Sequence, residues 1–453
     1  MCGIFAFVGL CPTPEKLCAA VEAVRHRGQS GFGVWAASNP GPDSAITHLI
    51  QTGPVQMALL PLLCGPDVRS LVAHWRYATR GVRSPVNSQP ILVDGGNAVI
   101  AQNGQLEFAA SDPRDSYSDT YRLARRIEEV RSGQLADRLI AAFDSVTGAA
   151  AIVAADENSL VALQDPFAIR PLFYGEYDGG WAVASEIPAL RVIGVKHAIP
   201  VGPGQVLKFE PRKRCQIMRQ GSHAQKRCAF EYVYFHSGNG ELDGKSVFSW
   251  RRRLGRQLAR EAPCASADIV VSVPRSANPT AEGFAAEAGL EKSDAIECVP
   301  GVQRTFIERD ASRLRTMENK YRFLRPMIER KSVVVVDDSI VRGDTIRYIA
   351  RQLRLNGATA VHARIGCPPF LFPCHFGIDV PDQEQLIGAN VSMLELGSRL
   401  GLDSLGFLAV DGLKRALRTE ALCTGCFNQA YPGAWQVRSK LPAPNANEHQ
   451  DRR

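Results

Sequence analysis

The sequence predicts two folded parts: a strand-rich N-terminal half and a C-terminal α/β domain built on a parallel sheet. The valines at 333–336 are too few for a helix and show no polar alternation. They therefore predict a strand buried on both faces, as in parallel sheets. Helical patterns at 247–261 and 346–355 flank this strand and a second apolar run at 268–273. In the N-terminal half, short apolar runs separated by turns fill residues 148–207.

Length and composition indicate a globular protein of two or three domains. The chain has 453 residues, of which 45% are hydrophobic, enough to form full cores. No apolar run reaches the length of about 18 residues that a membrane span needs, so no membrane association is expected. The N-terminus, MCGIFAFVG, lacks the basic and long apolar segments of a signal peptide. The expected compartment is the cytoplasm.

Charge and cysteine content narrow the function classes. The net charge of +7 is modest for this length and is spread along the chain. Its densest cluster, Arg251 to Arg253, is typical of a solvated helix face, so nucleic acid is an unlikely partner on this pattern. The 12 cysteines have irregular spacing. In a reducing compartment, such a set favours metal, cluster or catalytic use over a disulfide framework.

The segment at 331–345, KSVVVVDDSIVRGDT, adds chemistry to the buried strand. Asp337 and Asp338 come at its carboxyl end, where open α/β sheets bind ligands. A turn of small and polar residues then leads into a helix, whose N-terminal amides can hold an anion. Two carboxylates beside such a cradle suit a ligand with a phosphate and either hydroxyls or Mg²⁺. The alternative is that the two aspartates only cap the strand in a surface loop.

This segment resembles the phosphoribosyl pyrophosphate (PRPP) loop of the phosphoribosyltransferases, most of all that of the amidophosphoribosyltransferase family. The resemblance implies an α/β type I phosphoribosyltransferase domain in which Asp337 and Asp338 hold the ribose hydroxyls and Mg²⁺. It also implies that the following turn wraps the 5-phosphate. That turn includes Ser339, Arg342, Gly343, Asp344 and Thr345. One departure is Asp344, where the family usually has Thr, and a carboxylate there is unfavourable unless it faces away from the phosphate.

Cys2 is a candidate nucleophile. Removal of Met1, which a small second residue allows, would leave a thiol beside its own α-amino group. With a pKa of about 8 that amine can act as the base, and one residue would supply both nucleophile and base. A cysteine at position 2 does not by itself indicate a nucleophile. The motifs that follow it must support that role.

Five short motifs follow CGIF in a fixed order and together resemble the class II glutamine amidotransferase domain. They are HRGQ at 26–29, HWRY at 74–77, NSQP at 87–90, QNG at 102–104 and SDT at 118–120. The resemblance implies an N-terminal-nucleophile α+β sandwich, with two sheets covered by helices, over residues 2–222. It implies a phosphoribosyltransferase domain with C-terminal cluster-binding helices over 223–435, and residues 436–453 are expected to be a disordered tail.

The residue types in these motifs fit amide hydrolysis through a thioester. Asn103 and the backbone N–H of Gly104 would form the oxyanion hole. Arg76 would bind the α-carboxylate of glutamine and Asp119 its α-ammonium group. Arg27 would lie in a loop that shapes the glutamine pocket. The alternatives are a buried salt bridge for Arg76 and a helix N-cap for Asp119.

Four cysteines match the iron–sulfur-containing branch of the amidophosphoribosyltransferase family. Cys228 precedes EYVYF, Cys374 lies in PPFLFPCHFGID, and Cys423 and Cys426 form CTGC. The resemblance implies that these four thiolates bind a [4Fe–4S] cluster. The CxxC pair alone could equally bind zinc or be redox-active.

Two regions depart from the family. The pyrophosphate loop, usually Pro-Asp-Ser-Gly, reads Pro-Arg275-Ser276-Ala277 here. Ser276 keeps the implied place near Mg²⁺, and Arg275 could hold pyrophosphate directly. The closing loop keeps RTFI at 304–307 but lacks the basic segment expected just before it. Lys320 or Arg322 could replace the missing lysine.

These resemblances imply an enzyme that hydrolyses glutamine at Cys2 and passes ammonia internally to PRPP. The products would be 5-phosphoribosylamine and pyrophosphate, in the first step of de novo purine biosynthesis. Purine nucleotides as feedback inhibitors and a homo-oligomer are expected from the family. The alternatives are a diverged paralogue aminating another activated sugar in secondary metabolism, a PRPP-binding regulator, and a glutaminase with an inactive second domain.

Overall fold

The computed structural model describes residues 1–38, 45–52, 68–77, 84–108, 117–221, 224–299, 317–380 and 382–433. It forms two compact units. The first comprises Met1–Glu231, Phe235–Asp243 and His375–Asp379, and the second comprises the remainder. The first unit thus extends past residue 222 and takes in a short segment from far along the chain. The expected tail lies outside the described residues. Within the described part, no helix has the length and apolar character to cross a membrane.

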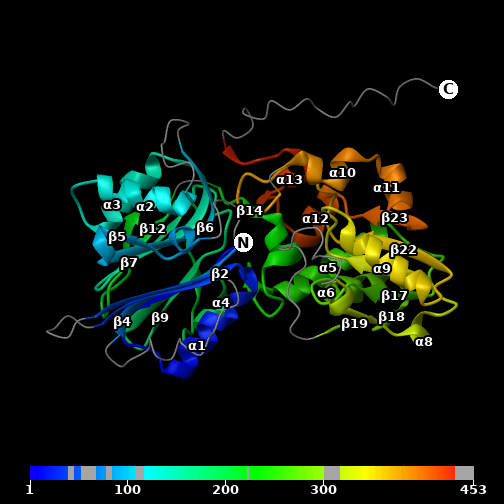
Figure 1. Cartoon of the computed structure of the whole chain (residues 1–453), viewed down its shortest axis with the longest axis horizontal. Coiled ribbons are helices and arrows are strands. Elements are labelled where there is room, and N and C mark those ends of the chain that lie inside the picture. Colours follow the sequence, from blue (N-terminus) through cyan, green and yellow to red (C-terminus); the bar gives the residue numbers. More distant parts are fainter. Residues whose placement is uncertain are drawn as a thin grey trace, which may run out of the picture. The chain divides into compact units, whose positions relative to one another are not determined.

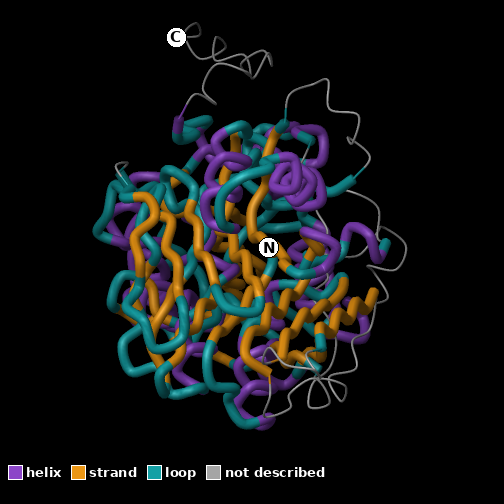
Figure 2. Tube along the Cα trace, turned by 90° about the vertical axis from the view of Figure 1, so that its left-hand side faces the viewer, coloured by secondary structure: helices purple, strands orange, loops and turns teal. Residues whose placement is uncertain are grey.

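The first unit is built on two sheets of antiparallel strands, which lie side by side toward the viewer in Figure 2. The seven-stranded sheet has the order β11-β9-β10-β1-β4-β2-β3, and the six-stranded sheet has the order β13-β12-β8-β7-β6-β5. The strands of the first sheet are β1 (Gly3–Val8), β2 (Gly31–Ser38), β3 (Ile46–Thr52), β4 (Val68–Arg76), β9 (Phe173–Tyr177), β10 (Gly180–Ala184) and β11 (Ile199–Pro200). Those of the second are β5 (Ile91–Val93), β6 (Ala98–Glu107), β7 (Thr147–Asp156), β8 (Leu160–Gln164), β12 (Val206–Phe209) and β13 (Gln216–Arg219).

Helices cover the outer faces of both sheets in this unit. Helices α2 (Asp119–Glu129) and α3 (Leu135–Asp144) pack on the six-stranded sheet, and α1 (Pro14–Ala23) and α4 (Ile187–Val192) pack on the seven-stranded one (Figure 1). Short 3₁₀ turns are η1 (Arg25–Arg27), η3 (Pro85–Asn87) and η4 (Asp94–Gly96). The result is the sandwich of two sheets between helices that the sequence predicts.

Strand β7 shows why this fold needs apolar residues on both faces of a strand. Successive side chains of a strand point to opposite faces. Ala150, Ile152 and Ala154 pack into the core beneath α2 and α3, while Ala151, Val153 and Ala155 pack into the core between the sheets. All six are buried, so β7 carries an unbroken apolar run although it is antiparallel to its neighbours.

The second unit is an α/β domain with the predicted parallel sheet, in the order β18-β17-β21-β22-β23. Its strands are β17 (Ile269–Ser272), β18 (Glu291–Ser293), β21 (Ser332–Asp337), β22 (Ala360–Ile365) and β23 (Ser404–Phe407). Its main helices are α5 (Val247–Glu261), α6 (Asn278–Ala288), α9 (Asp344–Leu355), α11 (Met393–Arg399) and α12 (Val410–Leu417) (Figure 1). Shorter elements are β19 (Ile296–Cys298), β20 (Tyr321–Phe323), α8 (Arg325–Ile328), α10 (Ile387–Asn390), α13 (Gly425–Asn428) and η7 (Gln383–Gln385). Two-residue strands β14 (Arg227–Cys228), β15 (Glu241–Leu242), β16 (Lys245–Ser246) and β24 (Leu422–Cys423) and the turn η5 (Glu231–Phe235) complete the described elements.

Helices α5 and α6 cross closely because each places a glycine at the contact. A Cβ on Gly255 would lie 1.9 Å from the carbonyl oxygen of Thr280, and one on Gly283 would lie 1.9 Å from that of Arg252. Both neighbours are backbone atoms, so neither can move aside without shifting a helix.

Replacing Gly255 with alanine should lower the free energy of unfolding by about 1–3 kcal/mol, because the added methyl group overpacks the helix crossing. The midpoint of urea denaturation measures this. Gly238→Ala is the matched control, since its Cβ would meet no described atom within 4 Å. Equal midpoints for the two variants would show that the crossing can relax.

Candidate active site

Cys2 lies directly before β1, the central strand of the seven-stranded sheet. It is 9% exposed. The backbone N–H of Tyr77 donates to its Sγ over 3.4 Å, and its own backbone N–H donates to Oδ1 of Asn103 over 2.9 Å. Pairing of Gly3 with Trp75 brings the end of β4 to this point. The nitrogen that would become the free amine is thus already held by a candidate catalytic side chain.

Asn103 and Gly104 lie next to each other in β6. Asn103 is fully buried, and its Nδ2 has no hydrogen-bond partner within the described part of the chain. A buried donor without a partner is costly in a resting protein. Gly104 has φ +156°, and a Cβ there would lie 2.0 Å from the carbonyl oxygen of Ala149. Only glycine fits, and an unused donor beside Cys2 suits an oxyanion hole.

Arg76 and Asp119 come from different layers of the same unit. Arg76 is the last residue of β4 and is buried. Asp119 is the first residue of α2, and its carboxylate accepts the backbone N–H of Leu106 in β6 over 2.9 Å. The N-cap of α2 is Ser118, whose side chain accepts from Tyr121 N–H. The capping role considered for Asp119 therefore belongs to its neighbour, and Asp119 ties α2 to the strand of Asn103.

In the second unit, the two aspartates occupy the carboxyl end of β21, as predicted for a parallel sheet. Asp337 ends the strand and Asp338 follows it, and both are buried. The N–H of Asp338 donates to Oδ1 of Asp337 over 2.8 Å. Burial, and next the charge of Asp338, raise the pKa of Asp337 well above its ordinary value, while Lys320 acts in the opposite direction. Two crowded buried carboxylates are the setting in which a bound cation is most favourable.

The loop at 274–277 contributes Ser276 to this acid pair. Its hydroxyl donates to Oδ2 of Asp338 over 2.5 Å, and the hydroxyl of Ser339 donates to Oδ1 over 2.8 Å. Ala277 has φ −82° and is buried. Replacement of the family glycine by alanine therefore causes no backbone strain in this structure. Arg275 is exposed beside Ser276.

The turn before α9 has the features of an anion cradle. Gly343 has φ +86°, and a Cβ there would lie 2.8 Å from Leu400 Cδ2. Arg342 donates to Oε1 of Gln385 through Nη2 over 2.5 Å. Asp344 lies in the first turn of α9, 3.5 Å from Arg347, and its side chain is 36% exposed. The exposed ion pair offsets the charge of the carboxylate that departs from the family pattern, and Thr345 follows it in the helix.

Of the two candidates for the missing lysine, Lys320 is the one whose charge acts on Asp337. Arg322 lies in β20 and is exposed. The RTFI segment at 304–307 lies outside the described residues. Two further residues lie near the aspartates, Tyr321 and Cys367, and no motif in the sequence pointed to either. Both are buried, and burial together with the charges of Asp337 and Asp338 raises their pKa values.

Comparison with known proteins shows to which family this chain belongs. A family model described as a glutamine amidotransferase domain matches residues 74–192. Soybean chloroplastic amidophosphoribosyltransferase is 35% identical over 450 residues, covering 95% of this chain and 78% of the relative. Amidophosphoribosyltransferase of Bacillus subtilis is 32% identical over 466 residues, covering 97% of this chain and 96% of the relative. The chain belongs to the amidophosphoribosyltransferase family.

Solved structures agree with this assignment. The glutamine PRPP amidotransferase of B. subtilis, complexed with ADP and GMP, has a TM-score of 0.82 at 30% identity, covering 95% of this chain and 97% of that one. A solved allosteric regulatory enzyme of purine biosynthesis has a TM-score of 0.84 at 31% identity, covering 95% and 96%. The chain is therefore an enzyme of the amidophosphoribosyltransferase family, with an N-terminal-nucleophile domain followed by a phosphoribosyltransferase domain.

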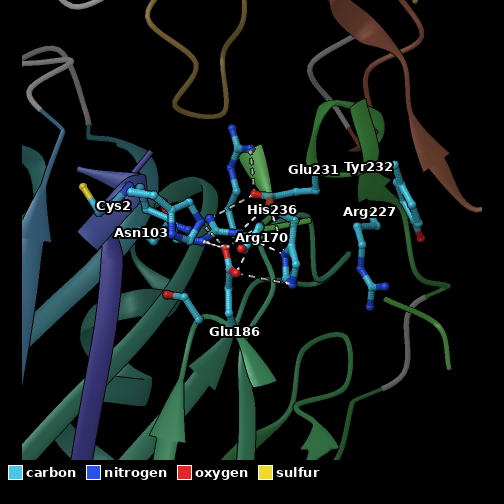
Figure 3. Close-up of polar contacts among 12 residues, drawn as sticks. Cys2, Asn103, Arg170, Glu186, Arg227, Glu231, Tyr232 and His236 are labelled. Carbon is cyan, nitrogen blue, oxygen red and sulfur yellow. Dashed lines mark hydrogen bonds and ion pairs between the residues drawn. The ribbon is translucent and has the colours of Figure 1, made fainter. Parts of the chain in front are cut away.

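The amidotransferase unit contains a buried ion network beside Cys2 and Asn103 (Figure 3). Arg27 donates through Nε to Glu186 over 2.6 Å and through Nη2 to Glu231 over 2.6 Å. Arg170 Nη1 lies 3.7 Å from Glu231, and Nδ1 of His236 lies 3.7 Å from the same carboxylate. All five side chains have no exposed surface.

Opposite charges keep these acids ionised. Burial by itself would raise the pKa of Glu231, but Arg27, His236 and Arg170 outweigh it and hold the pKa at about 2. Burial opposes ionisation of Glu186 likewise, and His236, His26 and Arg27 hold its pKa well below the ordinary value. Both glutamates are therefore charged at neutral pH, as the geometry requires.

The network changes what Arg27 can contribute. Its guanidinium is occupied by two protein carboxylates, so its part in glutamine binding would be to hold the loop at 25–28 in shape. Gly28, in the same loop, packs against β4. A Cβ on Gly28 would lie 2.5 Å from the carbonyl oxygen of Trp75. No role was predicted from the sequence for Glu186, Glu231 or His236. The two glutamates and the histidine stand in largely apolar segments that match the family, and this could have indicated that their side chains are buried and paired.

The four cysteines of the predicted cluster come from both units of the structure. Cys228 is buried in the first unit, and Cys374, Cys423 and Cys426 belong to the second. Burial is the main cause that raises the pKa of Tyr431, and Cys374, Cys423 and Cys426 raise it further. The backbone carbonyl of Cys426 accepts the N–H of Leu371, which ties the chain before Cys374 to the CxxC turn. No group of three or more His, Cys, Asp or Glu side chains converges as a metal site in the described ranges.

Substituting Glu231 by glutamine should lower the free energy of unfolding by about 3–5 kcal/mol, because two buried guanidinium groups lose a counter-charge. Urea denaturation of the purified variant measures the change. Glu287→Gln breaks the exposed pair with Arg260 and should leave the midpoint unchanged. A Glu231→Gln protein as stable as wild type would mean that the network relaxes or takes up water.

A pH-dependent prediction follows from Asp165, the residue that directly follows β8 and precedes the turn at 166–167. It is fully buried, and it accepts the N–H of Phe167 over 2.9 Å and that of Ile169 over 3.1 Å. Burial outweighs these hydrogen bonds and raises its pKa to about 7. A raised pKa means that the folded state binds the proton more tightly than the unfolded state. The stability that this group contributes is complete below about pH 4 and is lost as the pH rises through 7.

Asp165→Asn cannot ionise and should therefore gain stability relative to wild type with rising pH. The melting-temperature difference, variant minus wild type, should grow by roughly 5 °C between pH 5 and pH 8. Scanning calorimetry at four pH values in that range measures it. A difference that stays constant with pH would place the pKa of Asp165 below this range.

Proposed function

We propose that this chain hydrolyses glutamine at Cys2 and uses the ammonia to convert PRPP to 5-phosphoribosylamine, with release of pyrophosphate. This is the first step of de novo purine biosynthesis. The observation that carries the proposal is the pairing of Cys2 with Asn103. The Oδ1 of Asn103 holds the Cys2 nitrogen, and its Nδ2 is a buried donor without a described partner.

In the glutamine half-reaction, the α-amine freed by removal of Met1 takes the thiol proton of Cys2. The thiolate attacks the carboxamide carbon, and the new oxyanion accepts N–H groups from Asn103 Nδ2 and the Gly104 backbone. The C–N bond breaks, and ammonia leaves with the proton held by the amine. Water then hydrolyses the thioester to glutamate. Each oxyanion donor contributes about 10²–10³ in rate.

Recognition of glutamine is assigned to a fork-shaped cation and a carboxylate. Arg76 is buried at the end of β4, where a bidentate pair with the α-carboxylate would be strong because it is desolvated. Asp119 is held by the Leu106 N–H near the oxyanion donors and would accept from the α-ammonium group. Arg27 is assigned to the support of the loop between α1 and β2.

In the phosphoribosyl half-reaction, Asp337 and Asp338 would bind the ribose hydroxyls, and residues 339–345 would bind the 5-phosphate at the N-terminus of α9. This set includes Arg342, Gly343 and Thr345, with Asp344 turned toward Arg347. Ammonia attacks C1 from the face opposite pyrophosphate. The C1–O bond breaks as the C1–N bond forms, pyrophosphate leaves with the electron pair, and the new ammonium group loses one proton to water. Arg275 and Ser276 would bind its charge as it develops.

Magnesium fits the residues at this site. Asp337, Asp338 and Ser276 are hard oxygen donors, and burial, and next the charge of Asp338, raise the pKa of Asp337. When bound, the ion would neutralise the diphosphate and assist its departure.

We further propose a [4Fe–4S] cluster held by Cys228, Cys374, Cys423 and Cys426. Support comes from the hydrogen bond of the Leu371 N–H to the Cys426 carbonyl, which ties the chain before Cys374 to the CxxC turn, and from thiolates being the preferred ligands of such clusters. The side chains do not converge as a preformed metal site in the described structure.

We propose a cytoplasmic homo-oligomer that purine nucleotides inhibit. The support for regulation is that the B. subtilis relative is complexed with ADP and GMP. A diverged paralogue that aminates another activated sugar is favoured by one observation only, the exposed Arg275 in place of the family aspartate.

Cys2→Ala should lose glutamine-dependent pyrophosphate release from PRPP by about 10³-fold or more, while ammonia-dependent release stays near the wild-type rate. Cys18→Ala, in α1, is the matched control and should keep both activities. A coupled pyrophosphate assay at saturating Mg²⁺ measures them. Glutamine-dependent activity in the Cys2 variant would exclude it as the nucleophile. Wild-type protein that releases no pyrophosphate with ammonia would favour another sugar or an inactive second domain.

Protein purified without oxygen should contain about four iron atoms per chain, and Cys374→Ser should lose them. Cys264→Ser, at another buried cysteine, should retain the wild-type content. Assays of iron and acid-labile sulfide measure the cluster content of each protein. Wild-type protein free of iron and sulfide would remove the cluster from the proposal without affecting the glutaminase.

A further inference from the structure

A short segment from late in the chain packs on the strand that carries the proposed oxyanion donors. Residues His375–Asp379 belong to the first unit, although the residues before and after them belong to the second. A Cβ on Gly377 would lie 2.9 Å from the carbonyl oxygen of Gly104 and 3.0 Å from its carbonyl carbon. Gly377 also has φ +97°. Its backbone conformation and its close neighbour therefore both require glycine, and no step of the proposed mechanism uses this segment.

The backbone groups of Gly104 point to the side of β6 that faces away from β7. Gly104 is paired with Ala150 in β7. The carbonyl oxygen of Ala150 accepts the N–H of Asp165 over 3.0 Å on the other side of β7, where β8 lies. In an antiparallel pair, two opposite residues either bond to each other or both turn away. Gly104 therefore turns away from β7, and it lies beyond Ile100, the last residue of β6 that β5 pairs.

Side chains hold the N–H groups on either side of Gly104 along this edge of β6. The N–H of Gln102 donates to Oε1 of Gln89 over 2.6 Å. The N–H of Leu106 donates to the carboxylate of Asp119 over 2.9 Å. Since alternate residues of a strand direct their N–H groups to the same side, the N–H of Gly104 lies between these two. It faces the edge at which the glutamine carboxamide is proposed to bind.

The segment that packs on Gly104 is itself fixed by a buried guanidinium group. Arg170 donates to the carbonyl oxygen of Phe376, the residue before Gly377, through Nε over 2.9 Å and also through Nη2. Arg170 is fully buried, and its Nη1 lies 3.7 Å from Glu231 in the ion network. Two donors on one carbonyl, held beside a buried counter-charge, restrict the position of that peptide group. Movement of Gly377 relative to Gly104 is therefore resisted.

We propose that Gly377 is a positioning residue for glutamine hydrolysis. The segment His375–Asp379 supports Gly104 from its carbonyl side and keeps its N–H directed at the oxyanion. The inference rests on the proposed assignment of Gly104 as an oxyanion donor, and Gly377 acts only through that residue. A donor lowers the barrier only where charge develops, and misplacement by about 1 Å can cost about 10²-fold in rate. A side chain at 377 should therefore slow the chemical step without weakening the binding of glutamine.

Gly377→Ala in the full chain tests the proposal. Gly194→Ala is the matched control, because Gly194 has φ +101° in the same unit and a Cβ there would meet no described atom within 4 Å. The kcat of glutamine hydrolysis is counted per Cys2 that an alkylating glutamine analogue titrates. It should fall about 10–100-fold in Gly377→Ala and stay near the wild-type value in the control. The KM for glutamine and the ammonia-dependent release of pyrophosphate should be unchanged in both.

An aldehyde analogue of glutamine separates loss of positioning from loss of structure. The Cys2 thiol adds across its C=O bond, forming a C–S bond and passing the thiol proton to an oxygen that occupies the oxyanion position. Its inhibition constant should rise about 10–100-fold in Gly377→Ala, in parallel with the loss of kcat. The inhibition constant of glutamate, which forms no such adduct, should not change. A Gly377→Ala enzyme as fast as the control, or a slower one that binds the aldehyde as tightly as wild type, would overturn the inference.

Arg170→Lys provides a second variant should Gly377→Ala fail to fold. It keeps a positive charge beside Glu231 but cannot form the fork on the Phe376 carbonyl. The same pattern of losses should appear at about 3–10-fold, and wild-type values of kcat and of aldehyde binding would contradict the proposal. Wild-type protein that fails to hydrolyse glutamine would remove the proposed function itself. An active wild type with unaffected variants would remove only the role of Gly377.

Discussion

The hydrogen bond from the Cys2 nitrogen to Asn103 Oδ1 is the interaction on which the glutamine site depends. It joins the central strand of one sheet to a strand of the other and fixes the nitrogen that is to become the base. It also fixes the direction of the Asn103 amide, so that Nδ2 is left as a buried donor. In the proposed mechanism, Asn103 therefore both positions the base and donates to the oxyanion, so a small displacement of β1 or β6 would affect both roles.

The ion network beside this pair shows how the fold holds the loop that follows α1. Arg27 is buried between Glu186, which follows β10, and Glu231, which lies far along the chain. Buried ion pairs add little net stability compared with apolar residues, but loss of a single member is costly. Such a network therefore favours one arrangement of its loops over others. This specificity is what a site built from separated segments needs.

In the second unit, two acids lie next to each other instead of alternating with cations. Asp337 and Asp338 are crowded and buried, and the charge of Lys320 opposes their repulsion only in part. A cation bound by these carboxylates, as proposed, would relieve this repulsion. The departures from the family pattern are accommodated locally: Ala277 needs no positive φ, and Asp344 pairs with Arg347.

The sequence by itself determined the features that depend on local pattern. The unbroken valine run specified a buried parallel strand, and the acid pair and glycine after it predict a ligand-binding turn. Short motifs around Cys2, Asn103 and Asp119 specified the chemistry of the first unit. Only the tertiary structure decided the partners of these residues, because burial and pairing join positions far apart in the chain. The packing of Gly377 on Gly104, the capture of Arg27 by Glu186 and Glu231, and the tie from Asp119 to β6 all arise from strands and loops that meet only in the folded state.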